Sequence, residues 1–357
     1  MGFLINPYNF AAAGAGGWVE LGRFSGSATT LDVASLANKR YLMVLAYAPS
    51  LSTAATSRIK LNNDGAANRY ATRISYNGGA DDTTNYINYD ALEAKNGGET
   101  EQGWFDVGYF GNYSTKEKLN RAWNVSQNGI GAGIVPTRQD RVGKWIETTN
   151  PINRITYFFP AGGGITYGTG SEMIVLGWDP ADTHTNNFWT ELASVDVSGG
   201  LIDTNVFTAK KYLWIQGYCI NGTVSGGFQG MFVGNGTVDK TTPSYSLRYS
   251  VNGSVSDGTA INQSVNGPFA LTGQGGASSN DISFFNIFVI NNASKEKLFI
   301  GHNTFGSKTG GAGVANNRTE CVAKWTNTSN QINRISLEYV GGGGSLTAGT
   351  LKVWGSD

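Results

Sequence analysis

The chain has 357 residues and no net charge at neutral pH, because 26 Lys and Arg balance 26 Asp and Glu. A protein that grips a nucleic-acid backbone needs a basic face to displace counterions, and the sequence has no Lys/Arg cluster, which argues against nucleic-acid binding. Fifty glycines disfavour long helices, while 12% aromatic residues supply core volume and argue against disorder.

Residues 1–17 precede the rest of the pattern as a separate segment. An apolar, aromatic start is followed by an Ala/Gly-rich tether, which is typical of an arm that docks on another protein. The alternative is a strand that lies across its own first domain. The docking-arm candidates are Phe3, Leu4, Ile5, Pro7, Tyr8 and Phe10.

The start lacks the basic region and longer apolar core of a signal peptide. No run of about eighteen apolar residues follows, so we expect no membrane span.

Two sets of anchors divide the chain into similar halves. Lys-Glu-Lys-Leu occurs at 116–119 and 295–298, and Ile-Asn-Arg-Ile occurs at 152–155 and 332–335. In both cases the copies are about 180 residues apart, the signature of a tandem duplication. We therefore predict an arm (1–17), a first domain (18–179), a linker (180–188) and a second domain (189–357).

The pattern within each half is one of short apolar strands and glycine-rich turns. Asn77-Gly78 is a hairpin signal, and the nearly all-apolar run 282–290 predicts a central strand covered on both faces. The spacing is that of an antiparallel β-sandwich. The expected strands are 40–48, 69–76, 104–110, 116–125, 154–159 and 172–178, then 211–218, 245–251, 282–290, 297–300, 334–339 and 350–354.

Catalytic chemistry has little support in the sequence. His184 and His302 are the only histidines and lie far apart, which disfavours a catalytic triad or zinc hydrolase. Glycoside hydrolysis needs paired carboxylates, but several recur in both halves, so we interpret them as structural. These are Glu20 and Glu191, Asp32 and Asp203, and Glu117 and Glu296.

A calcium site is conceivable at 62–65 (Asn-Asn-Asp-Gly) or at Asp81-Asp82, but neither matches the EF-hand spacing. A tight turn is the favoured interpretation of both. We expect no enzyme activity, no cofactor and no metal.

Aromatic residues offer a second kind of site, because exposed rings on loops can stack on sugars. Tyr109 and Tyr113 are the candidate glycan contacts. Trp145 and Trp325 occupy matching places, and we expect both in the cores. Cys219 and Cys321 have no counterparts in the first half, so we favour two buried free thiols over a disulfide, although a pairing stays open.

The ends of both halves resemble a known family. Each runs from Ile-x-x-Ile through a short strand and a glycine-rich turn to an apolar strand that ends in Gly, at 152–177 and at 332–355. This resembles the C-terminal hairpin of jelly-roll domains in virion proteins of tailed bacteriophages. The opening Leu-Ile-Asn-Pro-Tyr at 4–8 looks like the start of many phage structural proteins. The resemblance carries no catalytic residues.

The resemblance implies two tandem jelly-roll sandwiches in a non-enzymatic structural protein located in a virion. Such a protein decorates or cements a capsid, or forms a head fibre or tail appendage, as a homo-oligomer in contact with other virion proteins. The alternative is a carbohydrate-binding adhesion module that recognises a host surface glycan. A polysaccharide-degrading enzyme is the least favoured hypothesis.

Overall fold

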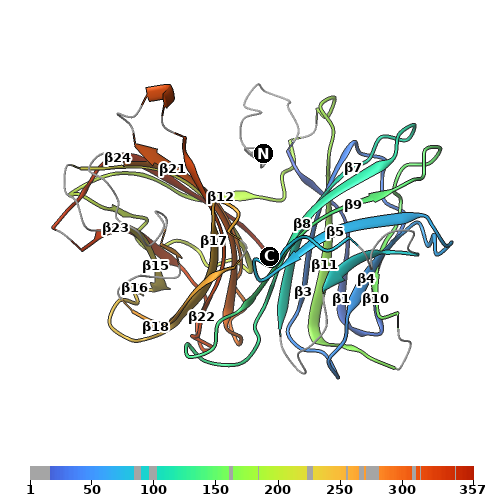
Figure 1. Cartoon of the computed structure of the whole chain (residues 1–357), viewed down its shortest axis with the longest axis horizontal. Coiled ribbons are helices and arrows are strands. Elements are labelled where there is room, and N and C mark those ends of the chain that lie inside the picture. The colour runs from blue at the N-terminus through green and yellow to red at the C-terminus, as the bar shows by residue number, and fades with distance from the viewer. Residues whose placement is uncertain are drawn as a thin grey trace. The chain divides into compact units, whose positions relative to one another are not determined.

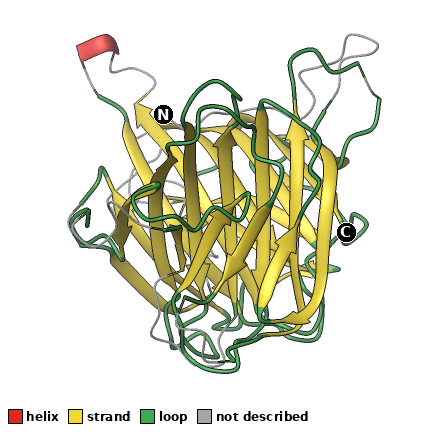
Figure 2. Ribbon diagram, turned by 90° about the vertical axis from the view of Figure 1, so that its right-hand side faces the viewer, coloured by secondary structure: helices red, strands yellow, loops and turns green. Residues whose placement is uncertain are grey.

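The structure, a computed structural model, is built almost wholly from β-strands (Figure 2). In the part of the chain that it describes, the only helical element is η1 (Gly311–Gly313). This confirms the predicted all-β fold. The described residues are 17–83, 90–95, 103–160, 164–183, 185–222, 228–254, 256–264, 269–270, 281–307, 311–313, 315–341 and 343–357.

The chain folds into two compact units. Unit 1 comprises Met1–Asn128 and Arg138–Trp189, and unit 2 comprises Gly129–Thr137 and Thr190–Asp357. The sequence pattern places residues 129–137 within the first half, whereas the structure groups them with unit 2. We describe each unit by itself.

Unit 1 contains two antiparallel sheets (Figure 1). The larger has the order β1-β11-β3-β7-β8-β9-β5, formed by β1 (Val19–Ala28), β11 (Tyr167–Trp178), β3 (Tyr41–Ala48), β7 (Trp104–Gly111), β8 (Lys118–Ser126), β9 (Thr137–Trp145) and β5 (Tyr70–Tyr76). The smaller has the order β2-β10-β4-β6, formed by β2 (Thr30–Val33), β10 (Ile155–Phe158), β4 (Ser57–Leu61) and β6 (Leu92–Lys95).

Unit 2 has the same plan with one further strand in each sheet. Its larger sheet contains β12 (Thr190–Asp196), β24 (Leu346–Ser356), β14 (Tyr212–Asn221), β20 (Asp281–Ile290), β21 (Lys297–Ser307), β22 (Asn317–Trp325), β17 (Tyr245–Val251) and β18 (Gly258–Gln263), in that order. Its smaller sheet contains β13 (Ile202–Asp203), β23 (Arg334–Val340), β15 (Phe228–Asn235) and β16 (Thr237–Val238), and β19 (Phe269–Ala270) also pairs with β15.

The strand order is that of a jelly roll. From β1 to β7 successive strands alternate between the two sheets of unit 1, and β10 and β11 do so again. The run β7-β8-β9 stays in one sheet, and unit 2 repeats this arrangement with β20-β21-β22. The internal duplication itself stays an inference from the sequence anchors.

Each unit buries its own core between its two sheets. In unit 1, apolar side chains of β2, β4 and β10 pack against those of β3, β7 and β11, with Trp145 at 2% exposure. In unit 2, β20 lies between β14 and β21, and Phe285 and Ile287 reach the core, as predicted for a central strand. Cys219 and Cys321 are both buried and free, in agreement with the favoured expectation.

The Arg of the repeated Ile-Asn-Arg-Ile motif has the same structural role in both units. Arg154 donates from Nε and Nη2 to the two carboxylate oxygens of Asp32, at 2.8 and 2.9 Å. Arg334 does the same to Asp203, at 2.9 and 2.6 Å. These bidentate pairs join β10 to β2 and β23 to β13. They explain why Asp32 and Asp203 recur without implying a ligand.

Removal of one such pair should cost stability rather than binding. In Arg334→Ala, Asp203 loses the hydrogen bonds that hold its pKa below the ordinary value. Because both side chains are only partly buried, we expect unit 2 to lose about 1–2 kcal/mol of unfolding free energy. Urea denaturation of Arg334→Ala beside Lys352→Ala measures this, and an equal effect of the two would refute a special role for the pair.

No helix among the residues that the structure describes has the length and apolar character needed to cross a membrane. The docking-arm candidates Phe3, Leu4, Ile5, Pro7, Tyr8 and Phe10 lie outside the described residues, so their role stays a prediction.

Candidate ligand-binding site

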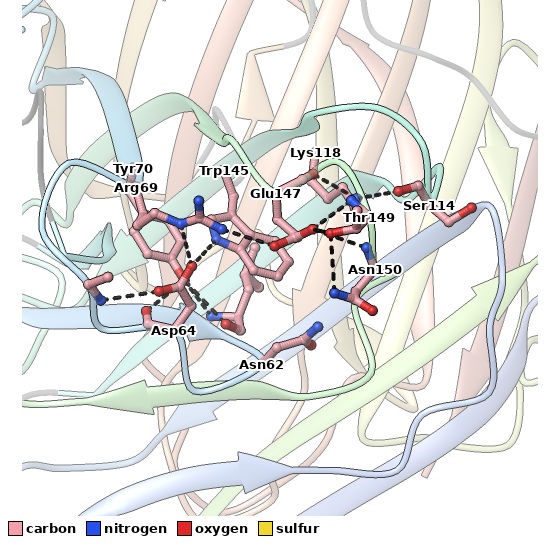
Figure 3. A network of polar contacts seen from close by, with 12 residues as sticks. Asn62, Asp64, Arg69, Tyr70, Ser114, Lys118, Trp145, Glu147, Thr149 and Asn150 are labelled. Atoms are coloured by element: carbon pink, nitrogen blue, oxygen red, sulfur yellow. Dashed lines mark hydrogen bonds and ion pairs between the residues drawn. The ribbon is translucent and has the colours of Figure 1, made fainter.

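Unit 1 carries an open hollow of about 380 Å³ at one end of its sandwich. It lies where the β4–β5 connection meets the end of β9 and the loop that follows (Figure 3). The lining residues are Asn62, Asp64, Ala66, Arg69, Trp145, Glu147 and Asn150. A volume of this size, with several polar groups converging on it, is within the range of small-ligand sites.

Asp64 is the centre of the hollow. Its carboxylate accepts hydrogen bonds from Arg69 Nε at 2.7 Å, from Trp145 Nε1 at 2.8 Å and from the Ala66 backbone N–H at 3.1 Å. The preceding Asn62 and Asn63 both adopt positive φ, which turns the chain so that Asp64 faces Trp145. The Asn-Asn-Asp-Gly stretch is thus the tight turn that the sequence favoured.

Glu147 forms the other side of the hollow. Its Oε2 accepts from Arg69 Nη2 at 3.0 Å, so the guanidinium lies between two carboxylates (Figure 3). Its Oε1 accepts from the backbone N–H groups of Thr149 at 2.5 Å and Asn150 at 3.1 Å, and from the Thr149 hydroxyl. Every carboxylate in the lining is therefore held in a fixed orientation.

The electrostatics of the hollow favour ionised carboxylates. Hydrogen bonds from Thr149 and Asn150, together with Arg69, lower the pKa of Glu147 to about 2. Burial raises the pKa of Asp64, but the bonds from Arg69 and Trp145 outweigh it and leave the value below the ordinary one. Glycoside hydrolysis needs one protonated carboxyl as general acid, and neither group supplies it at neutral pH. The geometry of the hollow suits the binding of a ligand.

The framework behind the hollow recurs in unit 2. Tyr70 Oη donates to the Asp64 carbonyl at 2.9 Å, and Tyr245 Oη donates to the Asp239 carbonyl at 2.8 Å. Trp325 Nε1 donates to Asp239 at 3.3 Å, as Trp145 does to Asp64.

Two buried lysines support this framework below the tryptophan rings. Lys118 Nζ donates to the carbonyl oxygens of Lys116 and Glu147, at 2.9 and 2.8 Å. Lys297 Nζ donates to those of Lys295 and Asn327, at 2.9 and 2.7 Å. The repeated parts therefore maintain the fold.

Two charged residues of the lining have neutral counterparts in unit 2. Ser244 takes the place of Arg69, and Asn327 takes the place of Glu147. Ser244 Oγ donates to Asp239 at 2.6 Å, and Asn327 Oδ1 accepts from the N–H groups of Ser329 and Asn330, at 2.9 and 2.8 Å. Unit 2 keeps the Asp–Trp contact and the turn after β22 with this neutral pair, so Arg69 and Glu147 are not needed for these two features. They are the candidate functional residues.

Sequence reasoning did not single out Arg69 and Glu147. A comparison of the two halves could have identified them. At each of these positions a charged residue in the first half has a neutral counterpart in the second, next to residues that match. The calcium alternative at Asp64 does not fit, because a guanidinium and an indole N–H already hold that carboxylate. No cluster of three or more His, Cys, Asp or Glu suited to a metal ion occurs among the described residues.

The two predicted glycan contacts lie apart from this hollow. Tyr109, in β7, packs its ring against Trp18 and Trp123, each with ring centroids 6.1 Å apart. Tyr113 follows β7, is 44% exposed and packs against Tyr41. Their role in sugar binding stays a prediction.

A second group of charges lies inside the core of unit 1. Arg141 donates to Asp106 at 2.5 Å and to the Ala94 carbonyl, and Tyr157 Oη donates to Asp106 at 2.6 Å. Glu93 lies within 3.4 Å of Arg58 Nε and is only 1% exposed. Since these groups are enclosed among the core residues, we interpret the cluster as structural.

Comparisons with known proteins identify no family. No protein-family model matches the chain, and no curated protein matches it. The LG1-3 region of the laminin α2 chain aligns with 92% of this chain and 64% of its own length, at 10% identity and a TM-score of 0.20. Domains LG4-5 of mouse laminin α1 align with 90% of this chain and 83% of theirs, at 11% identity and a TM-score of 0.16.

The attachment invasion locus protein Ail of Yersinia pestis aligns with 85% of this chain and 99% of its own, at 7% identity and a TM-score of 0.13. At such scores these likenesses carry no conclusion about fold or function. The class defined by the coordinates is a pair of all-β sandwich units of jelly-roll type.

Proposed function

We propose that this protein is a non-enzymatic binding protein whose unit 1 recognises a hydroxyl-rich, neutral glycan in the hollow at Arg69 and Glu147. The observation that supports the proposal is the replacement of these two residues by Ser244 and Asn327 on the same framework in unit 2. The fold alone does not decide function, since jelly rolls occur in both lectins and viral capsids.

The chemistry of the lining suits sugar hydroxyls. Asp64 accepts three internal hydrogen bonds and Glu147 Oε2 accepts one, so each carboxylate keeps a lone pair that can accept from a sugar hydroxyl. Arg69 is partly exposed and carries five N–H donors, of which Nε and Nη2 are used internally. Two carboxylates facing one guanidinium disfavour an anionic ligand, because like charges repel.

The double variant Arg69→Ser, Glu147→Asn should abolish glycan binding with little effect on folding. It installs the residues that unit 2 carries in the same frame, so we expect a stability change within about 1 kcal/mol. Loss of two charge-assisted contacts should weaken affinity at least about tenfold. A glycan array identifies the ligand, and calorimetric titration compares wild type with the variant.

A matched control is Arg40→Ser, Asp179→Asn, which removes another exposed Arg–carboxylate pair of unit 1, with N···O 3.5 Å. Glycan affinity of this control should equal that of wild type. A blank array, or equal loss in both double variants, would refute the proposed site.

A virion structural role is the second candidate, favoured by the phage resemblance of the repeated terminal hairpins and by the jelly-roll strand order. It is compatible with glycan binding, because a particle-surface protein can also adhere. Immunogold electron microscopy of particles from the source tests it. Regular labelling of heads supports a decoration, labelling at one tail end supports an appendage, and unlabelled particles would remove this candidate.

A further inference from the structure

The segment 129–137 covers one end of the larger sheet of unit 2. Lys324 Nζ, on β22, donates to the Gly129 carbonyl at 2.6 Å, and the Gly131 N–H donates to Glu296 Oε1 at 2.6 Å. Lys324 and Glu296 are themselves paired at 3.3 Å, with side chains 0% and 1% exposed. The segment thus seals an ion pair away from water.

Further contacts extend along β17 and β18. Ser246 Oγ donates to the Ile134 carbonyl at 2.9 Å, and Arg248 Nε donates to the Pro136 carbonyl at 2.9 Å. The Asn262 backbone N–H donates to the Ala132 carbonyl at 2.8 Å. In each of these five hydrogen bonds the group that belongs to residues 129–137 is a backbone N–H or carbonyl. The contact therefore depends on the backbone conformation of the segment more than on its side chains.

Glycine sets that path. Gly129 and Gly131 have φ of 138° and 90°, and a Cβ on Gly129 would lie 2.7 Å from Ile134 Cδ1. Only glycine adopts such angles without strain. The required feature is therefore a short glycine-rich loop of defined shape.

Unit 1 carries the matching ion pair and arginine on its larger sheet, without counterparts of the Ser246 hydroxyl (Ala71) or, among the described residues, of β18, and there the face is open. Lys144 and Glu117 match Lys324 and Glu296 in sequence and are paired at the same distance, 3.3 Å. Their side chains are 46% and 45% exposed. Arg73, the counterpart of Arg248, lies on the adjacent β5 and pairs only loosely, at 3.4 Å, with an exposed Asp81.

Apolar residues on this face of unit 1 are also open. Leu119 is 61% exposed and Val142 is 38% exposed. Their counterparts Leu298 and Val322 are each 1% exposed. A face that combines exposed aliphatic groups with a pre-formed ion pair is typical of an interaction surface.

The matching loop in unit 2 repeats the sequence of the covering segment. Gly131-Ala132-Gly133-Ile134 corresponds to Gly311-Ala312-Gly313-Val314. Residues 311–313 form η1, the red turn in Figure 2. The chain therefore contains two loops that share Gly-Ala-Gly, with Thr309 at the place of Gly129, and two faces that share an ion pair. The contacts above place the first loop on the second face.

We propose that the open face of unit 1, formed by Glu117, Lys144, Leu119, Val142 and Arg73, binds the Gly311–Gly313 loop of a second copy of this chain. The contact uses the ion pair and the arginine as residues 129–137 use those of unit 2. Loop and face are different surfaces, so the contact is heterologous and joins copies head to tail, into a closed ring or an open filament. This inference is independent of the glycan site.

Crosslinking between two chains that each carry one added cysteine tests the proposed pair of surfaces. Chains with Glu117→Cys are mixed with chains that carry Gly311→Cys, and a short bismaleimide is added. We expect a crosslinked dimer from the mixture only. The native thiols Cys219 and Cys321 are buried and should not react.

Three outcomes overturn the proposal. One is the absence of a dimer in the mixture. The second is a better yield when Gly131→Cys replaces Gly311→Cys, which would mean that the first loop is the occupant. The third is efficient crosslinking within one chain of the Glu117→Cys, Gly311→Cys double variant, which would mean that the face is filled in cis.

Sedimentation velocity over a concentration series provides a second readout. Wild type should associate, and Glu117→Gln, Lys144→Met should weaken association by about tenfold or more. The matched control is Glu191→Gln, Lys352→Met, which removes a pair of similar geometry (3.2 Å) and exposure (37% and 39%). A wild type that is monomeric throughout, or equal weakening in the control, would refute the proposal.

Discussion

Replacing Arg141 with Cys, the residue at the matching position 321 of unit 2, should lower the unfolding free energy of unit 1 by about 3–5 kcal/mol. The Arg141 and Asp106 side chains are 1% and 0% exposed. Without the guanidinium, the Asp106 carboxylate would stay in the core with the Tyr157 hydroxyl as its remaining hydrogen-bond donor among the described residues. An unpaired buried charge is among the costliest single defects in a protein.

The triple variant Asp106→Phe, Arg141→Cys, Tyr157→Leu should recover most of that loss. Unit 2 carries Phe285, Cys321 and Leu337 at the matching positions, and all three belong to its apolar core. Replacement of a buried ion pair by packed apolar groups is often neutral or stabilising. The three sites are in one network, so their effects should be strongly non-additive.

Chemical denaturation, combined with hydrogen exchange of the β7 amides, assigns the change to unit 1. A single variant as stable as wild type would mean that Asp106 is neutralised or hydrated in the folded state. A triple variant less stable than the single one would mean that Phe, Cys and Leu do not pack in the frame of unit 1.

The strands predicted best from sequence are those that are apolar on both faces or end at a clear turn. The run 245–251 matches β17 (Tyr245–Val251), and 282–290 lacks only one residue of β20. The equivalent strands β9 and β22 were missed, because Thr137–Trp145 alternates Arg, Asp and Lys with few apolar residues. β9 buries Arg141 by ion pairing, a long-range effect that has no local pattern.

The candidate site was only partly predictable for a similar reason. Asp64 stood out as part of a turn, and Trp145 as a repeated core residue. The site also requires Arg69 and Glu147, which are far apart in sequence and come together through the pairing of β5 with β9. The contacts of residues 129–137 with the rest of unit 2 are even harder to predict from the sequence, because they involve the backbone of the segment.

The pH dependence of stability should carry the signature of Glu93. Glu93 is 1% exposed, and burial raises its pKa to about 7, although Arg58, whose Nε lies 3.4 Å from Glu93 Oε2, and Arg141 act against the rise. The folded state then binds the proton more tightly than the unfolded state does. Protonated Glu93 therefore stabilises unit 1, and this stabilisation is fully present below the unfolded pKa of about 4.5. That stability is lost as the pH rises through about 7.

The variant Glu93→Gln removes this titration while it keeps the shape of the side chain. Relative to wild type, its unfolding free energy should rise by about 3 kcal/mol between pH 4.5 and pH 8, since each pKa unit is worth about 1.4 kcal/mol. Asp64 and Glu147 have lowered pKa values and change stability in the opposite direction, so the difference between the two proteins isolates Glu93. A pH-independent difference would show that Glu93 has the same pKa in the folded and unfolded states, with Arg58 and Arg141 fully compensating its burial.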